Sequence, residues 1–163
     1  MPSNKLMIKD GQVIENTWVL LTEENATTTE QPSIIPLGPY LADADTKASE
    51  NIGVFLENDT DLIEVAEQLL DAPVIAINFP GFMDGRGFSI ARLLRERYGY
   101  QGEIRAVGHV IRDQLTYLKR CGFTSFCFAE DVDVNAALNS LNDFTEAYQT
   151  SVELTEPLFK RRA

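Results

Sequence analysis

Residues 74–129 read VIAINFPGFMDGRGFSIARLLRERYGYQGEIRAVGHVIRDQLTYLKRCGFTSFCFA, in which short apolar runs alternate with longer amphipathic ones. The apolar runs have the length of buried strands, and the amphipathic runs repeat with the period of a helix. Strands are predicted at 74–79, 103–107 and 125–129, with helices at 89–98 and 111–121. Gly122 stands where a C-cap of the second of these helices belongs.

The same alternation extends to both sides of this stretch. A strand is predicted at 52–56, followed by a helix at 59–70, and another helix is predicted at 135–149. Four consecutive βα units indicate an α/β fold with a mainly parallel sheet and right-handed crossovers. Because a complete barrel needs eight such units, we expect an open sheet or a half-barrel-like layer.

The N-terminal region has β character. Residues 6–8 and 12–14 flank Asp10-Gly11, a turn signal that predicts an antiparallel hairpin at an edge of the sheet. Pro36 confines the short apolar run at 34–37 to an edge strand. We therefore expect one domain over 1–163: a β region at 1–37 with a flexible loop near 22–32, a βα core at 52–149 and a tail at 150–163 that docks or stays disordered.

Composition narrows the functional classes. Hydrophobic residues make up 44% of the 163 residues, which is typical of a folded domain, and no apolar run approaches the roughly 20 residues that span a bilayer. The first residues, MPSNKLMIKDG, lack a signal-peptide core, so a cytoplasmic location is expected. The net charge of −11 argues against nucleic acid or an anionic membrane as a partner.

The charge is unevenly distributed. Residues 74–129 carry +4 and the remainder of the chain −15. The basic segment indicates either a small-anion site or arginines that lie along helix surfaces and pair with acidic neighbours. Cys121 and Cys127, the two cysteines, match no zinc or redox spacing, and buried inert thiols are the simpler interpretation.

Ligands of parallel α/β proteins bind where strands end and helices begin. Four such junctions can be located here, at 57–59, 80–89, 108–110 and 130–131. The second, PGFMDGRGFS, contains the largest number of candidate ligand-binding residues. Gly87 and its neighbouring glycines allow close backbone approach, Ser89 is a candidate cap of the next helix, and Arg86 offers a fork of donors to phosphate, carboxylate, sulfite or sulfate.

Asp84 in the same loop is a candidate to orient Arg86 or to act as an acid or base. The alternative is that Asp84 pairs with an arginine and the glycines only turn the chain. The spacing G-x-x-x-G-x-G is neither a Rossmann fingerprint nor a Walker A loop. Nicotinamide, flavin and nucleotide cofactors therefore have no support from the pattern, and the cofactor stays unknown.

The third junction supplies further candidates. His109, the single histidine of the chain, is a candidate base, and Asp113 in the first turn of the next helix is either an acid-base group or a partner of the helix dipole. Arg112 is a candidate anion ligand. Arg105, within a predicted strand, is either buried and paired or exposed at an edge, and is included among the candidate anion-binding residues.

The central residues FPGFMDGRGFSIARLLRERYGYQGEIRAVGHVIRDQLTYLKRCGF and the ending YQTSVELTEPLFKRR resemble a bacterial family, domain of unknown function 934. The resemblance covers 79–126 and the C-terminal end. It marks as signature positions Asp84, Gly85, Arg86, Gly87, Ser89, Arg92, Arg105, Gly108, Asp113, Gln114, Arg120, Cys121 and Gly122. In that family an aspartate is common where this chain has His109, which weakens the case for a catalytic histidine.

Members of this family are often labelled as oxidoreductases of sulfite reduction, since their genes lie beside sulfite reductase genes. The resemblance implies an accessory or regulatory protein of assimilatory sulfite reduction, with sulfite reductase or its electron donor as partner. Six-electron sulfite reduction needs a haem-type centre and an iron–sulfur cluster with about four cysteine ligands. Because this chain has two cysteines, we expect that it is not a catalytic sulfite reductase by itself. The alternatives are an enzyme that acts on a small anionic substrate and a cofactor-binding oxidoreductase of sulfur metabolism.

Overall fold

A computed structural model of the chain describes residues 3–22, 30–81 and 85–141. They form one eight-stranded sheet in the order β2-β1-β8-β7-β6-β5-β4-β3. The strands are β1 (Ser3–Lys9), β2 (Gln12–Glu15), β3 (Val19–Leu20), β4 (Ser33–Pro36), β5 (Ile52–Leu56), β6 (Val74–Phe79), β7 (Glu103–Gly108) and β8 (Ser125–Ala129). The helices are α1 (Leu37–Ala42), α2 (Ala44–Lys47), α3 (Leu62–Leu69), α4 (Arg86–Glu96), the 3₁₀ turn η2 (Arg112–Gln114), α5 (Leu115–Cys121) and α6 (Val134–Leu141).

The sheet is a mixed half-barrel. Strands β3 to β8 pair in parallel, whereas β1 pairs antiparallel with both β2 and β8. The α/β class and the antiparallel N-terminal hairpin are therefore confirmed, and Asp10 and Gly11 both have the positive φ of its tight turn. The prediction of a sheet built mainly from four consecutive βα units is wrong, because those units supply four of its eight strands.

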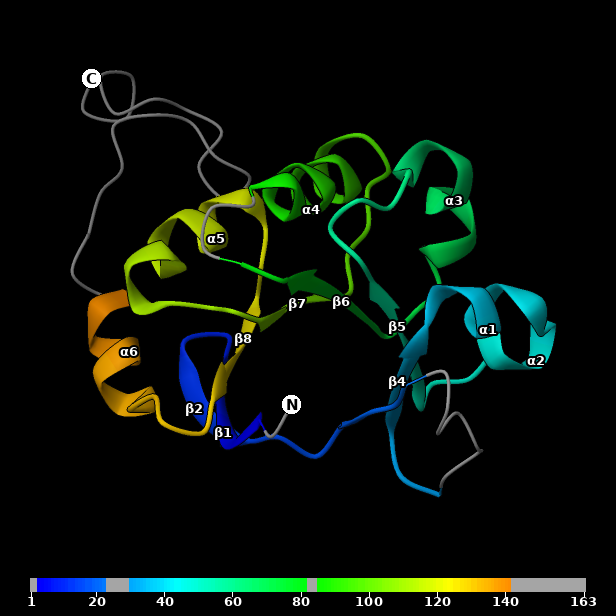
Figure 1. Cartoon of the computed structure of the whole chain (residues 1–163). Coiled ribbons are helices and arrows are strands. Elements are labelled where there is room, and N and C mark those ends of the chain that lie inside the picture. Colours follow the sequence, from blue (N-terminus) through cyan, green and yellow to red (C-terminus); the bar gives the residue numbers. More distant parts are fainter. Residues whose placement is uncertain (1–2, 23–29, 82–84, 142–163) are drawn as a thin grey trace.

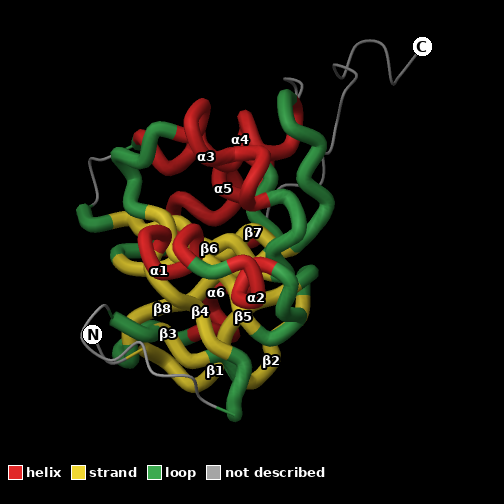
Figure 2. The backbone as a smooth tube through the Cα atoms, turned by 90° about the vertical axis from the view of Figure 1, so that its right-hand side faces the viewer, coloured by secondary structure: helices red, strands yellow, loops and turns green. Residues whose placement is uncertain are grey.

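The two faces of the sheet carry different layers. Helices α3, α4 and α5 lie along one face of the strands (Figures 1 and 2), and α6, which contacts β1 and β2, packs on the same core (Figure 1). The main core fills the space between these helices and the sheet, because every second residue of a strand points to that face, as Ile75 and Ile77 of β6 do. Between β2 and β3, residues 16–18 cross the other face (Figure 1), where Trp18 packs against a second cluster that includes Val74 and Cys127.

One expectation for the region before β5 needs correction. Strand β4 lies inside the sheet, between β3 and β5, although Pro36 predicted an edge. The proline is tolerated because it is the last residue of β4, and β3 pairs only with Ser33 and Ile34. Residues 44–47 form α2, which Asp43 caps by accepting a hydrogen bond from the Asp45 amide.

The predicted helix boundaries hold in part. Helix α3 begins after the cap Asp61, whose side chain accepts from the Ile63 amide, and Gly122 ends α5 in the left-handed conformation. Helix α6 is described as far as Leu141, so the predicted continuation to 149 and the tail at 150–163 lie outside the described residues. None of the helices in the described part of the chain has the length and apolar content needed to cross a membrane.

Candidate functional site

The junctions after β5, β6, β7 and β8 lie at one edge of the sheet. These strands are parallel neighbours, and the register pairs Phe79, the last residue of β6, with Gly108, the last of β7. Because parallel strands end at the same edge, the segments that follow them in the chain are brought together there. The four junctions therefore lie at one edge, as the sequence predicted, and this edge is the candidate ligand site.

The second junction leads into α4, an eleven-residue helix that begins at Arg86. Gly87 is buried, and a Cβ at this position would lie 2.8 Å from Cζ of Phe79, so glycine lets the helix start pack directly on β6. Arg86 is exposed at the edge. Asp84 lies outside the described residues.

Ser89 does not cap this helix. The N-cap is Gly85, with no side-chain capping bond, and Ser89 is the fourth residue of α4. The sequence prediction placed the start three residues too late because serine is the stronger capping residue. Ser89 is nevertheless exposed in the first turn, on the same junction as Arg86.

The third junction is fixed to the end of β6 by its backbone. Gly108 has φ +86°, and a Cβ there would lie 2.4 Å from Oδ1 of Asn78 and 2.7 Å from the Phe79 carbonyl oxygen. The next amide, that of His109, donates to the same Phe79 carbonyl at 2.6 Å. Glycine is needed at position 108 because both the positive φ and the close approach exclude a side chain. The His109 side chain is exposed beside the second junction.

Arg112 and Asp113 follow in η2, and both side chains are exposed. The Nε of Arg112 donates a hydrogen bond to Oγ of Ser140 on α6. This contact joins η2 to α6. The site residues that the sequence predicted at the second and third junctions are thus at one edge, except Asp84, whose place is not described.

Arg105 does not join them. It lies near the start of β7, is 2% exposed, and donates through Nε to Oε1 of Glu103 at 2.8 Å. Glu103 also accepts from Ser125 at 2.5 Å and pairs with Lys9 at 2.8 Å. Of the two alternatives for Arg105, the buried and paired one is correct. Its guanidinium is committed to Glu103, so Arg105 is not among the residues proposed to bind an anion.

Residues of the segment 16–18 cover this ion pair inside the half-barrel. Nη1 of Arg105 donates to Oδ1 of Asn16 at 3.2 Å, and the Trp18 ring centre lies 6.0 Å from the guanidinium carbon. Burial opposes ionisation of Glu103, but Arg105 and Lys9 outweigh it and hold the pKa of that carboxyl below its ordinary value. The network therefore ties the crossing segment 16–18 to the middle of the sheet.

The cysteines are buried free thiols. Burial raises the pKa of Cys121 and raises that of Cys127 to about 11, so both are protonated at neutral pH. Within the residues that the structure describes, no group of three or more histidine, cysteine or acidic side chains is placed to hold a metal ion.

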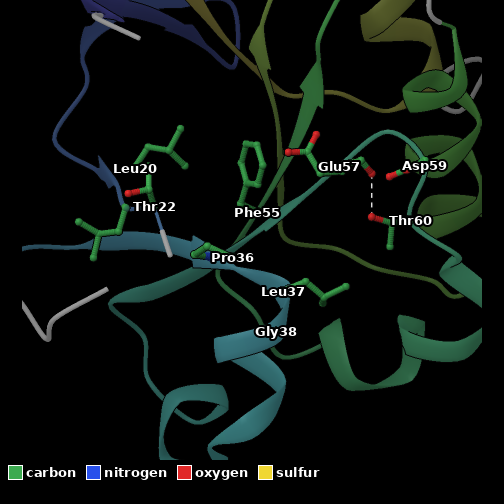
Figure 3. A pocket seen from close by; sticks show the side chains of 10 residues that line it. Leu20, Thr22, Pro36, Leu37, Gly38, Phe55, Glu57, Asp59 and Thr60 are labelled. Atoms are coloured by element: carbon green, nitrogen blue, oxygen red, sulfur yellow. Dashed lines mark hydrogen bonds between the residues drawn. The ribbon is translucent and has the colours of Figure 1, made fainter. Parts of the chain in front are cut away.

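A pocket at the same edge was missed from the sequence. It has a volume of about 530 Å³ and lies where β3, β4 and β5 end. In Figure 3, Leu20, Phe55 and Glu57 stand in a row above Pro36 and Leu37. The alternation of Phe55 and Glu57 along one strand face is visible in the sequence, but nothing local indicates that Leu20 faces them across the sheet.

Comparisons with known proteins identify a family. The family model described as "Bacterial protein of unknown function (DUF934)" matches residues 53–159. The comparisons with curated proteins and with solved structures found no match. The matched region runs from the second residue of β5 through β8 and contains all four junctions of the candidate site. The chain belongs to the bacterial protein family DUF934.

Proposed function

We propose that the protein is an accessory or regulatory protein of assimilatory sulfite reduction that binds a small anion where β6 and β7 end. The observation that carries the anion site is the joining of these two strand ends, where the His109 amide bonds to the Phe79 carbonyl. The exposed Arg86 and Arg112 follow these two neighbouring strand ends in the chain.

Physical chemistry supports an anion at this place. Arg86 is the first residue of an eleven-residue helix, and the dipole at a helix N-terminus favours negative charge. Guanidinium groups bind oxyanions through paired N–H donors. Residues 74–129, which contain both arginines, carry +4 in a chain of net charge −11, so an anion is attracted to this segment more than to the rest of the surface.

The link to sulfite reduction rests on the family resemblance, and the accessory role rests on the cysteines. Two cysteines cannot supply the roughly four ligands of an iron–sulfur cluster. Both thiols are buried with raised pKa values, which does not favour thiol redox chemistry. The proposed role is therefore to bind sulfite, or an anion that reports sulfur supply, while acting with sulfite reductase or its electron donor.

Titration calorimetry tests the anion site. Sulfite (under argon), sulfate and phosphate are titrated into the wild-type protein, the double variant Arg86→Ala/Arg112→Ala and the control Arg97→Ala, which removes an exposed arginine at the other end of α4. We expect the double variant to lose at least about 10-fold in affinity, from two charge-assisted contacts. Affinity that is unchanged in the double variant, or lost equally in the control, contradicts the site.

Growth of bacteria tests the cellular role. A clean deletion strain should grow poorly with sulfate or sulfite as sole sulfur source and normally with cysteine. Complementation with the wild-type gene should restore growth, and complementation with the double variant should not. Normal growth of the deletion strain on sulfite would contradict a role in sulfite reduction.

A second candidate function is an enzyme that acts on a small anionic substrate. It is favoured by the exposed His109 and Asp113, two titratable groups on the same junction as Arg112. The variants His109→Asn and Asp113→Asn distinguish the two functions, because they should abolish turnover in an enzyme while leaving anion affinity within about threefold. For a cofactor-binding oxidoreductase, thermal stabilisation by a flavin or nicotinamide nucleotide is the corresponding test.

A further inference from the structure

The pocket at the ends of β3, β4 and β5 is separate from the anion site. Its volume of about 530 Å³ lies within the range of about 300–1,000 Å³ that is typical of small-molecule sites. It stands at the strand-end edge of the half-barrel, where ligands of parallel α/β folds bind. None of its lining residues belongs to the second or third junction.

Most of the pocket wall is apolar. The residues that supply it are Leu20, Leu21, Pro36, Leu37 and Phe55. Leu20 is 49% exposed, so a large apolar side chain faces solvent at the pocket. A ligand with an apolar body would remove this surface from water and gain free energy in proportion to the area covered.

The charged part of the wall is negative. Glu57 and Asp59 are the charged residues among the lining side chains, and no lysine or arginine lines the pocket within the described residues. Glu57 is held in place, because its Oε2 accepts from Nδ2 of Asn78 at 2.8 Å and its carbonyl accepts from the Thr60 hydroxyl at 2.7 Å (Figure 3). An oriented carboxylate beside an apolar wall favours a cation that carries hydrophobic carbon.

We propose that this pocket binds a small organic cation, a molecule with an apolar body and an amino or guanidino group. The body lies against Leu20, Leu37 and Phe55, and the cationic group pairs with Glu57. A hard metal ion fits less well, since it takes six or more oxygen ligands and the wall is mostly carbon. An anion is disfavoured by the two carboxylates.

Three probes of similar shape and different charge test the proposal: 2-phenylethylamine (cation), 2-phenylethanol (neutral) and 3-phenylpropanoate (anion). Binding is measured at pH 7 by protein-observed NMR titration. The amine should bind with a dissociation constant of about 1 mM, as expected for a ligand of this size. The alcohol should bind about 3- to 10-fold more weakly, which is the value of one partly exposed ion pair, and the anion more weakly still.

Variants connect this preference to the pocket. Glu57→Gln should reduce amine affinity to that of the alcohol without changing alcohol binding, while Leu20→Ser should weaken both ligands. The control Glu64→Gln removes an exposed carboxylate from α3, and Arg86→Ala/Arg112→Ala tests independence from the anion site. Neither should change amine binding. Equal affinity for amine and anion, no effect of Glu57→Gln, or no binding of any probe at 10 mM would overturn the proposal.

Discussion

Replacing Arg105 with methionine should lower the free energy of unfolding by about 3 kcal/mol at pH 7. The substitution keeps a long apolar side chain in the sheet but leaves the buried carboxylate of Glu103 without its closest cation, whose Nη2 lies 2.7 Å from Oε1. Removing one partner of a buried ion pair typically costs about 3–5 kcal/mol. We expect the low end, because Ser125 and Lys9 still contact Glu103 and Lys9 is partly in water.

Urea unfolding, followed by circular dichroism, measures this cost. Against a total stability of about 5–15 kcal/mol the loss is large, and it should lower the melting temperature by about 6–12 °C. The control Arg97→Met removes an exposed arginine and should change stability by less than about 0.5 kcal/mol. The double variant Arg105→Met/Glu103→Gln should be more stable than Arg105→Met alone, because it also removes the buried negative charge.

Two results would refute the buried ion pair. One is a loss below about 1 kcal/mol in Arg105→Met, which is the value of an exposed pair. The other is a double variant no more stable than the single one, which would mean that lost packing, and not an unpaired charge, causes the destabilisation.

Further predictions concern pH, backbone and thiols. The folded-state pKa of Glu103 lies below its ordinary value of 4.5, so the stability that this carboxylate contributes is complete above pH 4.5 and is lost as the pH falls through the folded-state pKa. In a plot of unfolding free energy against pH, Glu103→Gln should therefore reduce the slope on the acid side. Gly108→Ala should destabilise by at least about 2 kcal/mol in thermal melts, whereas Gly38→Ala, in a helix with open space around it, should stabilise by about 0.5–1 kcal/mol. Cys121 and Cys127 should react with a thiol reagent at pH 8 far more slowly in the native protein than in urea, and equal rates would contradict their burial.

The βα core could be predicted because its signals are local. Strands β5, β6 and β8 are apolar runs bounded by turn residues, and their observed limits coincide with the predicted ones. The position of β4 could not be predicted, since pairing with the two-residue β3 depends on contacts across the sheet. The start of α4 was misplaced because intrinsic capping preference favours Ser89 over Gly85.

In the candidate site, too, features that follow from local sequence could be predicted and long-range contacts could not. The strand-end junctions follow from chain order and parallel pairing, so their clustering was predictable. The burial of Arg105 against Glu103 could have been anticipated, because residues two apart on a strand share a face. The Leu20 side of the pocket could not, since it joins residues about 35 positions apart that no periodicity connects.

The proposed anion site at the ends of β6 and β7 is tested most directly by an NMR titration of ¹⁵N-labelled protein with sulfite under argon. We expect the largest amide shift changes at Arg86, Gly87 and His109, saturating with one affinity, and their loss in Arg86→Ala/Arg112→Ala. Shift changes confined to other parts of the chain, or no saturable change up to 20 mM sulfite, would contradict an anion site at this edge.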